Sequence, residues 1–328
     1  MRVYIIRRLL LIIPTLFLVS FIIFFMIRLI PGDIVDAIAT ESGMEGMVVD
    51  VDRDAIIKAL GLDVPTPIQY GRWIGVLPGA DGSFSGLFQG DLGTSMRRWS
   101  PVSEEILRTL PVTLELGFLA LIIAQLIALP IGIFSALRQD TWGDYIGRSF
   151  AIMCIAVPGF WLATLVIVFP SIWWGYSPSI MLIRFTDDPI GNLEMFIIPA
   201  IVLGMAMSGG TMRMTRTMML EVLRQDYIRT AWAKGLRERV VIIRHALKNA
   251  LIPVITLLGP QVLIMIGGAV IIEQIFGLPG MGRLGLEALL GRDYTLLSGV
   301  MLIMGFAIML TNLAVDLAYG FLDPRIRY

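Results

Sequence analysis

The sequence has very few of the residues that build metal centres and disulfides. Its 328 residues include one cysteine and one histidine. A single cysteine cannot form an intramolecular disulfide, so this chain has no disulfide framework, and we interpret Cys154 as a small buried hydrophobic residue. Zinc and haem sites need several His or Cys ligands near one another. Cys154 and His245 are far apart in the sequence, which argues against such a site.

The sequence also lacks a phosphate-binding loop, because no glycine is followed directly by lysine. P-loop phosphate chemistry is therefore excluded from this chain. The formal net charge is zero, so there is no global bias toward nucleic acid. We expect no nucleic-acid partner and no catalytic, cofactor-binding or metal-ligating residues in the chain.

Charged residues are missing from several long stretches. Hydrophobic residues make up 56% of the chain and the mean hydropathy is +0.80, whereas soluble domains are about 45–50% apolar. About 20 helical residues cross the roughly 30 Å of hydrocarbon in a bilayer. We therefore predict an all-α integral membrane protein with six transmembrane helices. The uncharged segments of at least 18 residues are Leu9–Ile27, Leu116–Leu137, Ser149–Ile183 (only its first part spanning), Met195–Met212, Asn249–Ile272 and Tyr294–Val315.

The cores of these six segments hold no ionisable side chain. Ion-coupled carriers and proton pumps usually carry such residues in mid-span, so their absence argues against ion-coupled transport. It also argues against hydrolysis within the membrane, because no catalytic group can assemble there. Pro130 and Pro158 are predicted to kink their helices.

Four neutral polar residues remain inside the predicted spans, and they allow two interpretations. They could line a translocation pathway, or they could form interhelical hydrogen bonds worth about 0.6–2 kcal/mol each. The residues are Gln125, Ser208, Gln261 and Asn312.

Lys and Arg positions predict the orientation, because cytoplasmic loops are enriched in them. Three arginines lie within the first eight residues. Segment 31–105 has five basic and twelve acidic residues, whereas loop 213–250 has nine basic and three acidic residues. We expect both termini in the cytoplasm (N-in, C-in). The predicted division is an N-terminal helix (1–30), an external segment (31–108, with one helix at Asp54–Leu60) and a five-helix core (109–328).

The cytoplasmic loop 213–250 has a helical pattern. Met219, Leu223, Tyr227 and Ala231 recur every four residues, which predicts one shared face. Asp226 can cap a helix start with its carboxylate, which would divide the stretch into two helices.

A short second helix is predicted to follow this cap. Gly235 can end it in the left-handed conformation, with Lys234 at the negative end of the helix dipole. The helix Tyr227–Lys234 would be about 12 Å long. Such a helix could dock into a groove of a partner protein or lie on anionic lipid.

Motifs are spread along nearly the whole chain. They are Arg28–Asp33, Leu60–Asp63 with Gln69-Tyr70 and Trp73, Gly90–Ser95, Asp226–Leu236, Arg244–Pro253, Gly267–Glu273, Phe276–Leu284 and Leu322–Arg327. Together they resemble the motifs of one family, the binding-protein-dependent ABC importer permeases of the dipeptide, oligopeptide and nickel branch. The wider superfamily's loop begins Glu-Ala-Ala, whereas this chain has Arg229-Thr230-Ala231, a departure typical of the branch.

The resemblance implies a type I ABC importer permease fold and a pore-forming permease subunit in the inner cell membrane. Its implied partners are a second homologous permease, two ATP-binding subunits that hold ATP and Mg, an external substrate-binding protein and membrane lipid. Implied solutes are peptides or similar small molecules. The alternative is an ATP-independent channel or carrier. The residues implied to couple to the ATPase are Asp226, Tyr227, Arg229, Thr230, Ala231, Lys234 and Gly235.

Overall fold

A computed structural model describes residues 2–29, 63–79, 82–175, 177, 179 and 181–322. The predicted helix Asp54–Leu60 and most of the Leu322–Arg327 motif lie outside these ranges. The chain forms two compact units. Unit 1 comprises residues 1–8, 111–283 and 308–328, and unit 2 comprises residues 9–110 and 284–307.

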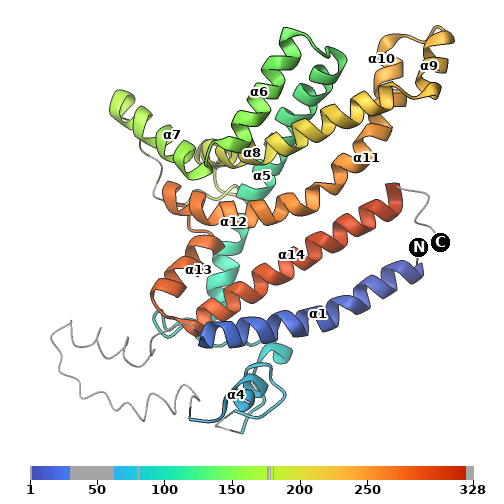
Figure 1. Cartoon of the computed structure of the whole chain (residues 1–328). Coiled ribbons are helices and arrows are strands. Elements are labelled where there is room, and N and C mark those ends of the chain that lie inside the picture. Colours follow the sequence, from blue (N-terminus) through green and yellow to red (C-terminus); the bar gives the residue numbers. More distant parts are fainter. Residues whose placement is uncertain are drawn as a thin grey trace. The chain divides into compact units, whose positions relative to one another are not determined.

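The secondary structure of the described residues is helical, apart from one isolated β-bridge between Thr94 and Pro101. Figure 1 labels most of them. The helices are α1 (Arg2–Arg28), α4 (Thr66–Trp73), η1 (Leu87–Gln89), α5 (Val102–Leu137), α6 (Trp142–Ala156), α7 (Gly159–Trp174), α8 (Pro189–Leu223), α9 (Asp226–Ala233), α10 (Glu238–Val240), the π-helix η2 (Val241–Leu247), α11 (Lys248–Thr256), α12 (Leu258–Phe276), α13 (Met281–Leu290) and α14 (Tyr294–Leu322).

Five of the described helices are long and apolar enough to cross a membrane, and a sixth span results if α6 and α7 are taken together. The prediction of a multi-span all-α membrane fold is thereby confirmed. The predicted span Asn249–Ile272 starts too early, because α11 ends at Thr256 and the apolar helix α12 begins at Leu258.

The third predicted span differs most from the structure. Pro158 does more than kink a helix: α6 ends at Ala156, α7 begins at Gly159, and the two helices are bent by 95°. Proline has no backbone N–H and disfavours the helical conformation at the preceding residue. Val157 accordingly has extended backbone angles, φ −78° and ψ 120°. By contrast, α5 continues through Pro130.

The core of unit 1 lies where α5 packs against α8 and α12. Leu116, Ala120 and Ala124 are fully buried at a spacing of four residues, so they form one stripe along α5. The approach of α8 is close, since a Cβ on Gly204 would lie 2.8 Å from the carbonyl oxygen of Ala120. Small residues at such contacts allow membrane helices to pack tightly.

In unit 2, α4 packs against the end of α1. Tyr70 and Trp73 of α4 contact the ring of Phe24, and the Tyr70 hydroxyl hydrogen-bonds to Ser20 at 2.9 Å. Arg28 donates to the Gln69 side chain at 2.7 Å. The family-like motif Gln69-Tyr70 and Trp73 therefore anchors α4 to the end of α1.

Candidate functional site

Helix α9 begins directly after a two-residue break at the end of α8. Its N-cap residue is Gln225, whose side chain makes no capping hydrogen bond. The prediction that Asp226 caps the helix is therefore wrong. Asp226 is the first helical residue, and its almost fully exposed carboxylate accepts from Arg229 at 3.4 Å. A negative charge in the first turn still interacts favourably with the helix dipole.

The C-terminal end of α9 is formed as predicted. Gly235 has φ +72°, a left-handed conformation that glycine adopts without steric cost. Its N–H donates to the Trp232 carbonyl at 2.9 Å, and the Leu236 N–H donates to the Ala231 carbonyl at 3.4 Å. This pair of bonds is the Schellman motif. The helix has the predicted eight residues but starts one residue earlier, at Asp226.

The buried face of α9 agrees with the predicted one at Ala231 but not at Tyr227. Ile228 (0% exposed) and Ala231 pack against Ala136 of α5 and Met219 of α8. Tyr227 is exposed instead, and its hydroxyl accepts a hydrogen bond from the Asn249 amide at 2.8 Å. The break between α8 and α9 resets the helical phase, so a spacing of four residues across it does not preserve one face.

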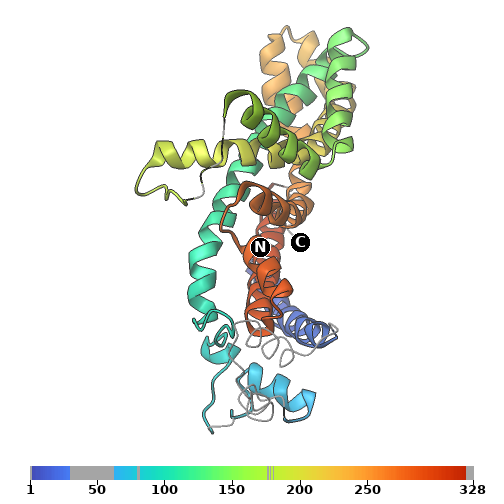
Figure 2. The ribbon, with the colours of Figure 1, turned by 90° about the vertical axis from the view of Figure 1, so that its left-hand side faces the viewer.

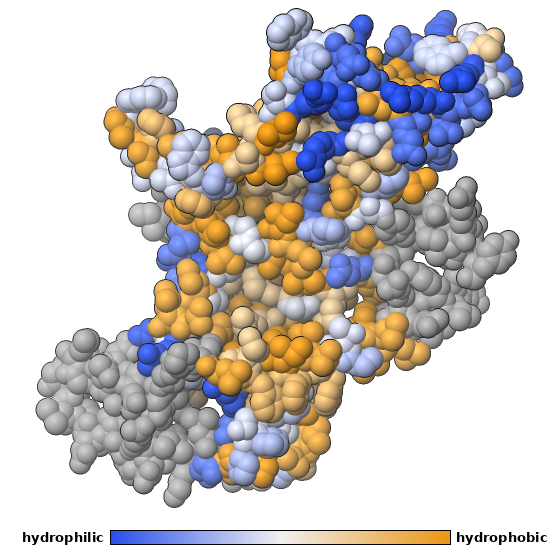
Figure 3. Space-filling model, viewed as in Figure 1, coloured by the Kyte–Doolittle hydropathy of each residue, from blue (hydrophilic) through white to orange (hydrophobic). Residues whose placement is uncertain are grey.

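The exposed face of α9 carries most of the predicted coupling residues. Asp226, Tyr227, Arg229, Thr230, Lys234 and Gly235 are exposed. Trp232, 45% exposed, lies among them, and sequence reasoning did not single it out. Its signal was an aromatic residue in a short amphipathic helix within the basic loop 213–250. Hydrophilic residues gather at this end of unit 1, with isolated hydrophobic ones among them (Figure 3). Exposed Trp, Tyr and Arg are enriched in protein-binding hot spots.

A buried ion pair supports α8 close to α9. Asp144, in the first turn of α6, is 0% exposed. Both of its carboxylate oxygens accept from Arg216 of α8, each at 2.7 Å, in the bidentate geometry that is strongest for such pairs. The same carboxylate accepts from the Ser135 hydroxyl at 2.9 Å and from the Asp140 N–H at 3.1 Å.

The turn between α5 and α6 is thereby tied to α8. Figures 1 and 2 show the end of α5 and the start of α6 lying beside α9 and α10 at one end of unit 1. Sequence reasoning missed this pair, because Asp144 and Arg216 are 72 residues apart. The sequence signal at this position was two aspartates, Asp140 and Asp144, in the short loop 138–148.

The structure brings together two of the four predicted pathway residues. The Gln125 amide of α5 donates to the Gln261 side chain of α12 at 3.1 Å. Gln261 is buried and donates to the Thr211 hydroxyl and to the Met207 carbonyl of α8. These contacts favour interhelical hydrogen bonding for the buried Gln261, and sequence reasoning missed Thr211 as one of its partners.

The other two predicted pathway residues lie apart from the glutamine pair. Ser208 is buried and donates to the Met205 carbonyl of its own helix at 2.8 Å. Asn312 lies exposed on α14.

A buried carboxylate fixes the turn after α12. Glu273 lies inside the last turn of α12 rather than beyond the span, and it is fully buried. It accepts from the Thr113 hydroxyl at 2.5 Å and from the Arg283 N–H at 2.9 Å. A Cβ on Gly280 would lie 2.1 Å from its carboxyl carbon. Glycine is therefore required where the turn passes over Glu273.

Comparisons with known proteins cover nearly the whole chain. Residues 128–328 match the family described as binding-protein-dependent transport system inner membrane component, and residues 1–117 match the N-terminal part of such membrane components. A Brucella abortus protein with the provisional name of a peptide transport system permease is 40% identical over 328 residues, covering 100% of both chains. The dipeptide transport system permease of Escherichia coli is 38% identical over 349 residues, covering 99% of this chain and 98% of the relative.

A solved structure supports the same fold. An inward-facing methionine ABC transporter aligns with a TM-score of 0.52 and 16% sequence identity, covering 67% of this chain and 96% of that one. The type I ABC importer permease fold expected from the sequence is confirmed.

Proposed function

Because the chain belongs to the family of binding-protein-dependent transport system inner membrane components, we propose that it imports peptides or similar small solutes delivered by an external binding protein. It is a multi-pass inner-membrane protein, the pore-forming permease subunit of an ABC importer, and not an enzyme. The peptide substrate is supported by the names of the relatives, which belong to peptide and dipeptide transport systems.

The proposed mechanism rests on how α9 packs against the rest of unit 1. The helix exposes Tyr227, Arg229 and Trp232 while Ile228 and Ala231 are locked into the cluster with α5 and α8. We infer that this exposed face docks into an ATP-binding subunit on the cytoplasmic side. ATP and Mg are then held by two such partner subunits, because this chain has no P-loop.

The packing of α9 explains how a partner's motion would reach the pore. Protein interiors are close-packed and transmit displacement rather than absorb it. A push on α9 acts on Met219 and Ala136 through Ile228, and the Asp144–Arg216 pair joins the α5–α6 turn to α8. The end of α5, the start of α6 and the end of α8 would therefore move together.

In this proposal, the chain and a second, homologous permease together form the transport pathway. Gln125 is partly exposed and Asn312 is exposed, so these two are the better pathway candidates. Ser208 and Gln261 are buried, which supports a packing role for them. Both termini are taken as cytoplasmic from the Lys and Arg distribution.

Purification from the native membrane tests the proposal. The tagged chain should co-purify with a second permease and two ATP-binding subunits. In proteoliposomes, uptake of a radiolabelled dipeptide should require ATP and the external binding protein. A homomer of this chain that takes up solute without ATP would establish the alternative, an ATP-independent channel or carrier, and refute the proposal.

A further inference from the structure

Two arginines from neighbouring helices of unit 1 line one small pocket. Arg148 of α6 and Arg213 of α8 meet there, together with Arg216 of α8, and we refer to it as the arginine pocket. Arg213 is exposed, whereas Arg148 is half-buried with its guanidinium carbon 4.9 Å from the centre of the Tyr145 ring. Three guanidinium groups therefore gather at one end of the contact between α6 and α8.

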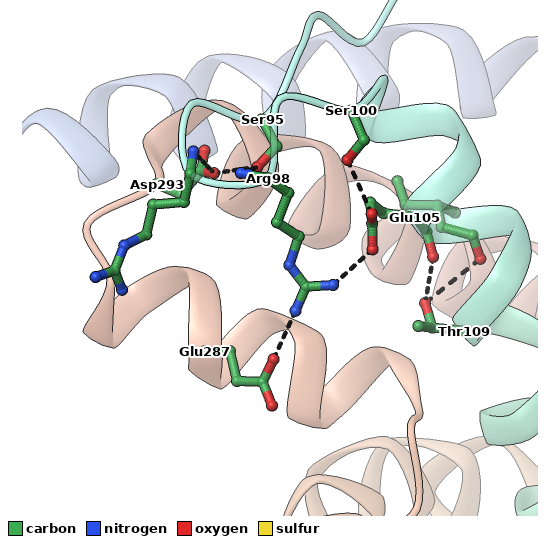
Figure 4. Close-up of polar contacts among 9 residues, drawn as sticks. Ser95, Arg98, Ser100, Glu105, Thr109, Glu287 and Asp293 are labelled. Atoms are coloured by element: carbon green, nitrogen blue, oxygen red, sulfur yellow. Dashed lines mark hydrogen bonds and ion pairs between the residues drawn. The ribbon is translucent and has the colours of Figure 1, made fainter. Parts of the chain in front are cut away.

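Two other contacts show how this chain neutralises an arginine. Arg98 is held between two glutamates, at 2.6 Å from each (Figure 4), and Arg216 takes both carboxylate oxygens of Asp144. Across the described residues, no carboxylate forms an ion pair with Arg148 or Arg213. The positive charges of these two arginines therefore remain for an anion from outside the chain.

Both arginines stand at the same boundary of the uncharged segments. Arg148 directly precedes the segment that starts at Ser149, and Arg213 directly follows the segment that ends at Met212. Trp142, 83% exposed, precedes them, as is typical of an aromatic residue at the membrane interface. The expected orientation makes this the cytoplasmic side. Anionic lipids give that leaflet its negative surface potential, and basic pockets between membrane helices bind such headgroups.

An apolar pocket of about 140 Å³ lies farther along the same helices, at the break between α6 and α7. Helix α8 packs against both of them (Figure 1). The lining consists of hydrophobic side chains, a glycine and Cys154, with Met153 from α6 and Met205 from α8 among them. Water would find no good hydrogen-bond partners there, whereas a hydrocarbon chain would make dispersion contacts with the walls. The composition therefore favours a hydrocarbon occupant.

One face of α8 connects the two pockets. Ala206 lines the apolar pocket and Arg213 lines the arginine pocket, with the exposed Gly210 between them. Spacings of four and three residues place all three on one helix face. No atom lies within 4 Å of a Cβ at Gly210, so this part of the surface is open. Ala206 and Arg213 are about 10 Å apart along the helix axis, and one leaflet's share of the hydrocarbon is about 15 Å.

We propose that the surface between α6 and α8 binds one anionic phospholipid of the cytoplasmic leaflet. Arg148 and Arg213 hold its phosphate through charge-assisted hydrogen bonds, and one acyl chain runs past Gly210 into the apolar pocket. A zwitterionic headgroup fits less well, because its ammonium would lie beside guanidinium groups of the same sign. The bound lipid would join α6 to α8 at the end where the Asp144–Arg216 pair also joins them. The inference goes beyond the proposed function and rests on the fold and on the expected orientation.

Photolabelling identifies the occupant. The protein, with the subunits that co-purify with it, is placed in phosphatidylcholine nanodiscs that contain a minor fraction of phosphatidylglycerol with a diazirine on one acyl chain. Mass spectrometry should find the label on Met153 or Met205, and a phosphatidylcholine carrying the same diazirine should label them about tenfold less. Equal labelling by the two lipids, or label spread evenly over the apolar helices, would overturn the proposal. So would the absence of label from both methionines, as expected if a second permease covers this surface.

Arginine variants test the headgroup contact. The double variant Arg148→Gln, Arg213→Gln should raise the Kd for phosphatidylglycerol, measured by native mass spectrometry on the same complex, about tenfold. Arg239→Gln is the control, because it removes an exposed arginine of the same cytoplasmic loop that lines neither pocket. An unchanged Kd in the double variant, or an equal rise in the control, would refute the headgroup contact.

A glycine variant tests the acyl-chain path without changing any charge. Gly210→Leu puts a side chain into open space, and leucine favours the helix more than glycine does, so folding should be preserved. Labelling of the apolar pocket should nevertheless be lost, because the leucine blocks the path to it. Gly267→Leu, at an equally open position of α12, should leave labelling unchanged. Full labelling of Gly210→Leu would show that no acyl chain takes this path.

Discussion

Removing Arg216 should destabilise the protein more than removing its partner Asp144. Arg216→Ala leaves a fully buried carboxylate with only the Ser135 hydroxyl and the Asp140 N–H as donors. Breaking a buried pair in this way costs about 3–5 kcal/mol. The Arg216 side chain is 18% exposed, which points to the lower end, about 3 kcal/mol.

The opposite deletion has a milder expected effect. Asp144→Ala leaves Arg216 with a partial route to water, and a long cationic side chain can turn its head outward. We expect a loss of about 1.5–3 kcal/mol, the range for hydrogen bonds to charged groups. The double variant should lose less than the sum of the two single losses, by about 1–3 kcal/mol, because the two residues are in direct contact.

Unfolding of the purified protein by SDS in mixed micelles measures these free energies. Arg229→Ala is the matched control, because its pair with Asp226 is almost fully exposed and should change stability by less than about 0.5 kcal/mol. Equal losses for the two single variants, or a loss below about 1 kcal/mol for Arg216→Ala, would refute the reasoning. Transport per ATP hydrolysed should fall in step with the loss, because the pair joins the α5–α6 turn to α8.

Three further substitutions address the coupling helix, the turn after α12 and the glutamine pair. Gly235→Val should cost about 1–2 kcal/mol through its left-handed backbone alone, since open space surrounds a Cβ there; ATP hydrolysis should uncouple from transport while membrane insertion is retained. Gly280→Ala should destabilise by about 1–3 kcal/mol as its Cβ displaces the Glu273 carboxylate. Gln261→Leu should cost about 0.6–2 kcal/mol and leave the KM for solute unchanged, because its partners are Gln125 and α8.

Each of these has a contrasting variant or outcome. Gly235→Asn should retain coupling, because asparagine tolerates the left-handed conformation, and wild-type transport by Gly235→Val would count against the coupling role. Gly267→Ala should be neutral or stabilising, because no atom lies within 4 Å of a Cβ at this helical position. If it lost as much stability as Gly280→Ala, a clash between the Cβ at position 280 and the Glu273 carboxylate would not explain the loss. A changed KM at full stability in Gln261→Leu would restore the pathway interpretation for this residue.

The sequence by itself determined the features that depend on local composition and backbone chemistry. A long segment without charges is apolar enough to lie in the bilayer, and about 20 helical residues cross it. The approximate positions of the spans therefore follow from the lengths of these segments. Gly235 ends a helix because it lacks a Cβ. At Pro158 the sequence predicted a kink through the missing N–H, and the structure has a full break between two helices. The family motifs added the fold and the role as a permease, which the comparisons confirmed.

Tertiary structure alone decided which side chains meet. The pairing of Asp144 with Arg216 and of Gln125 with Gln261 joins helices that no periodicity connects. The buried face of α9 passes through Ile228 rather than Tyr227, because the break after α8 resets the helical phase. Asp226 fails to cap α9 because the chain enters the helix one residue earlier, at Gln225. Such contacts depend on how helices pack in space, and helix packing is fixed only when distant segments come together.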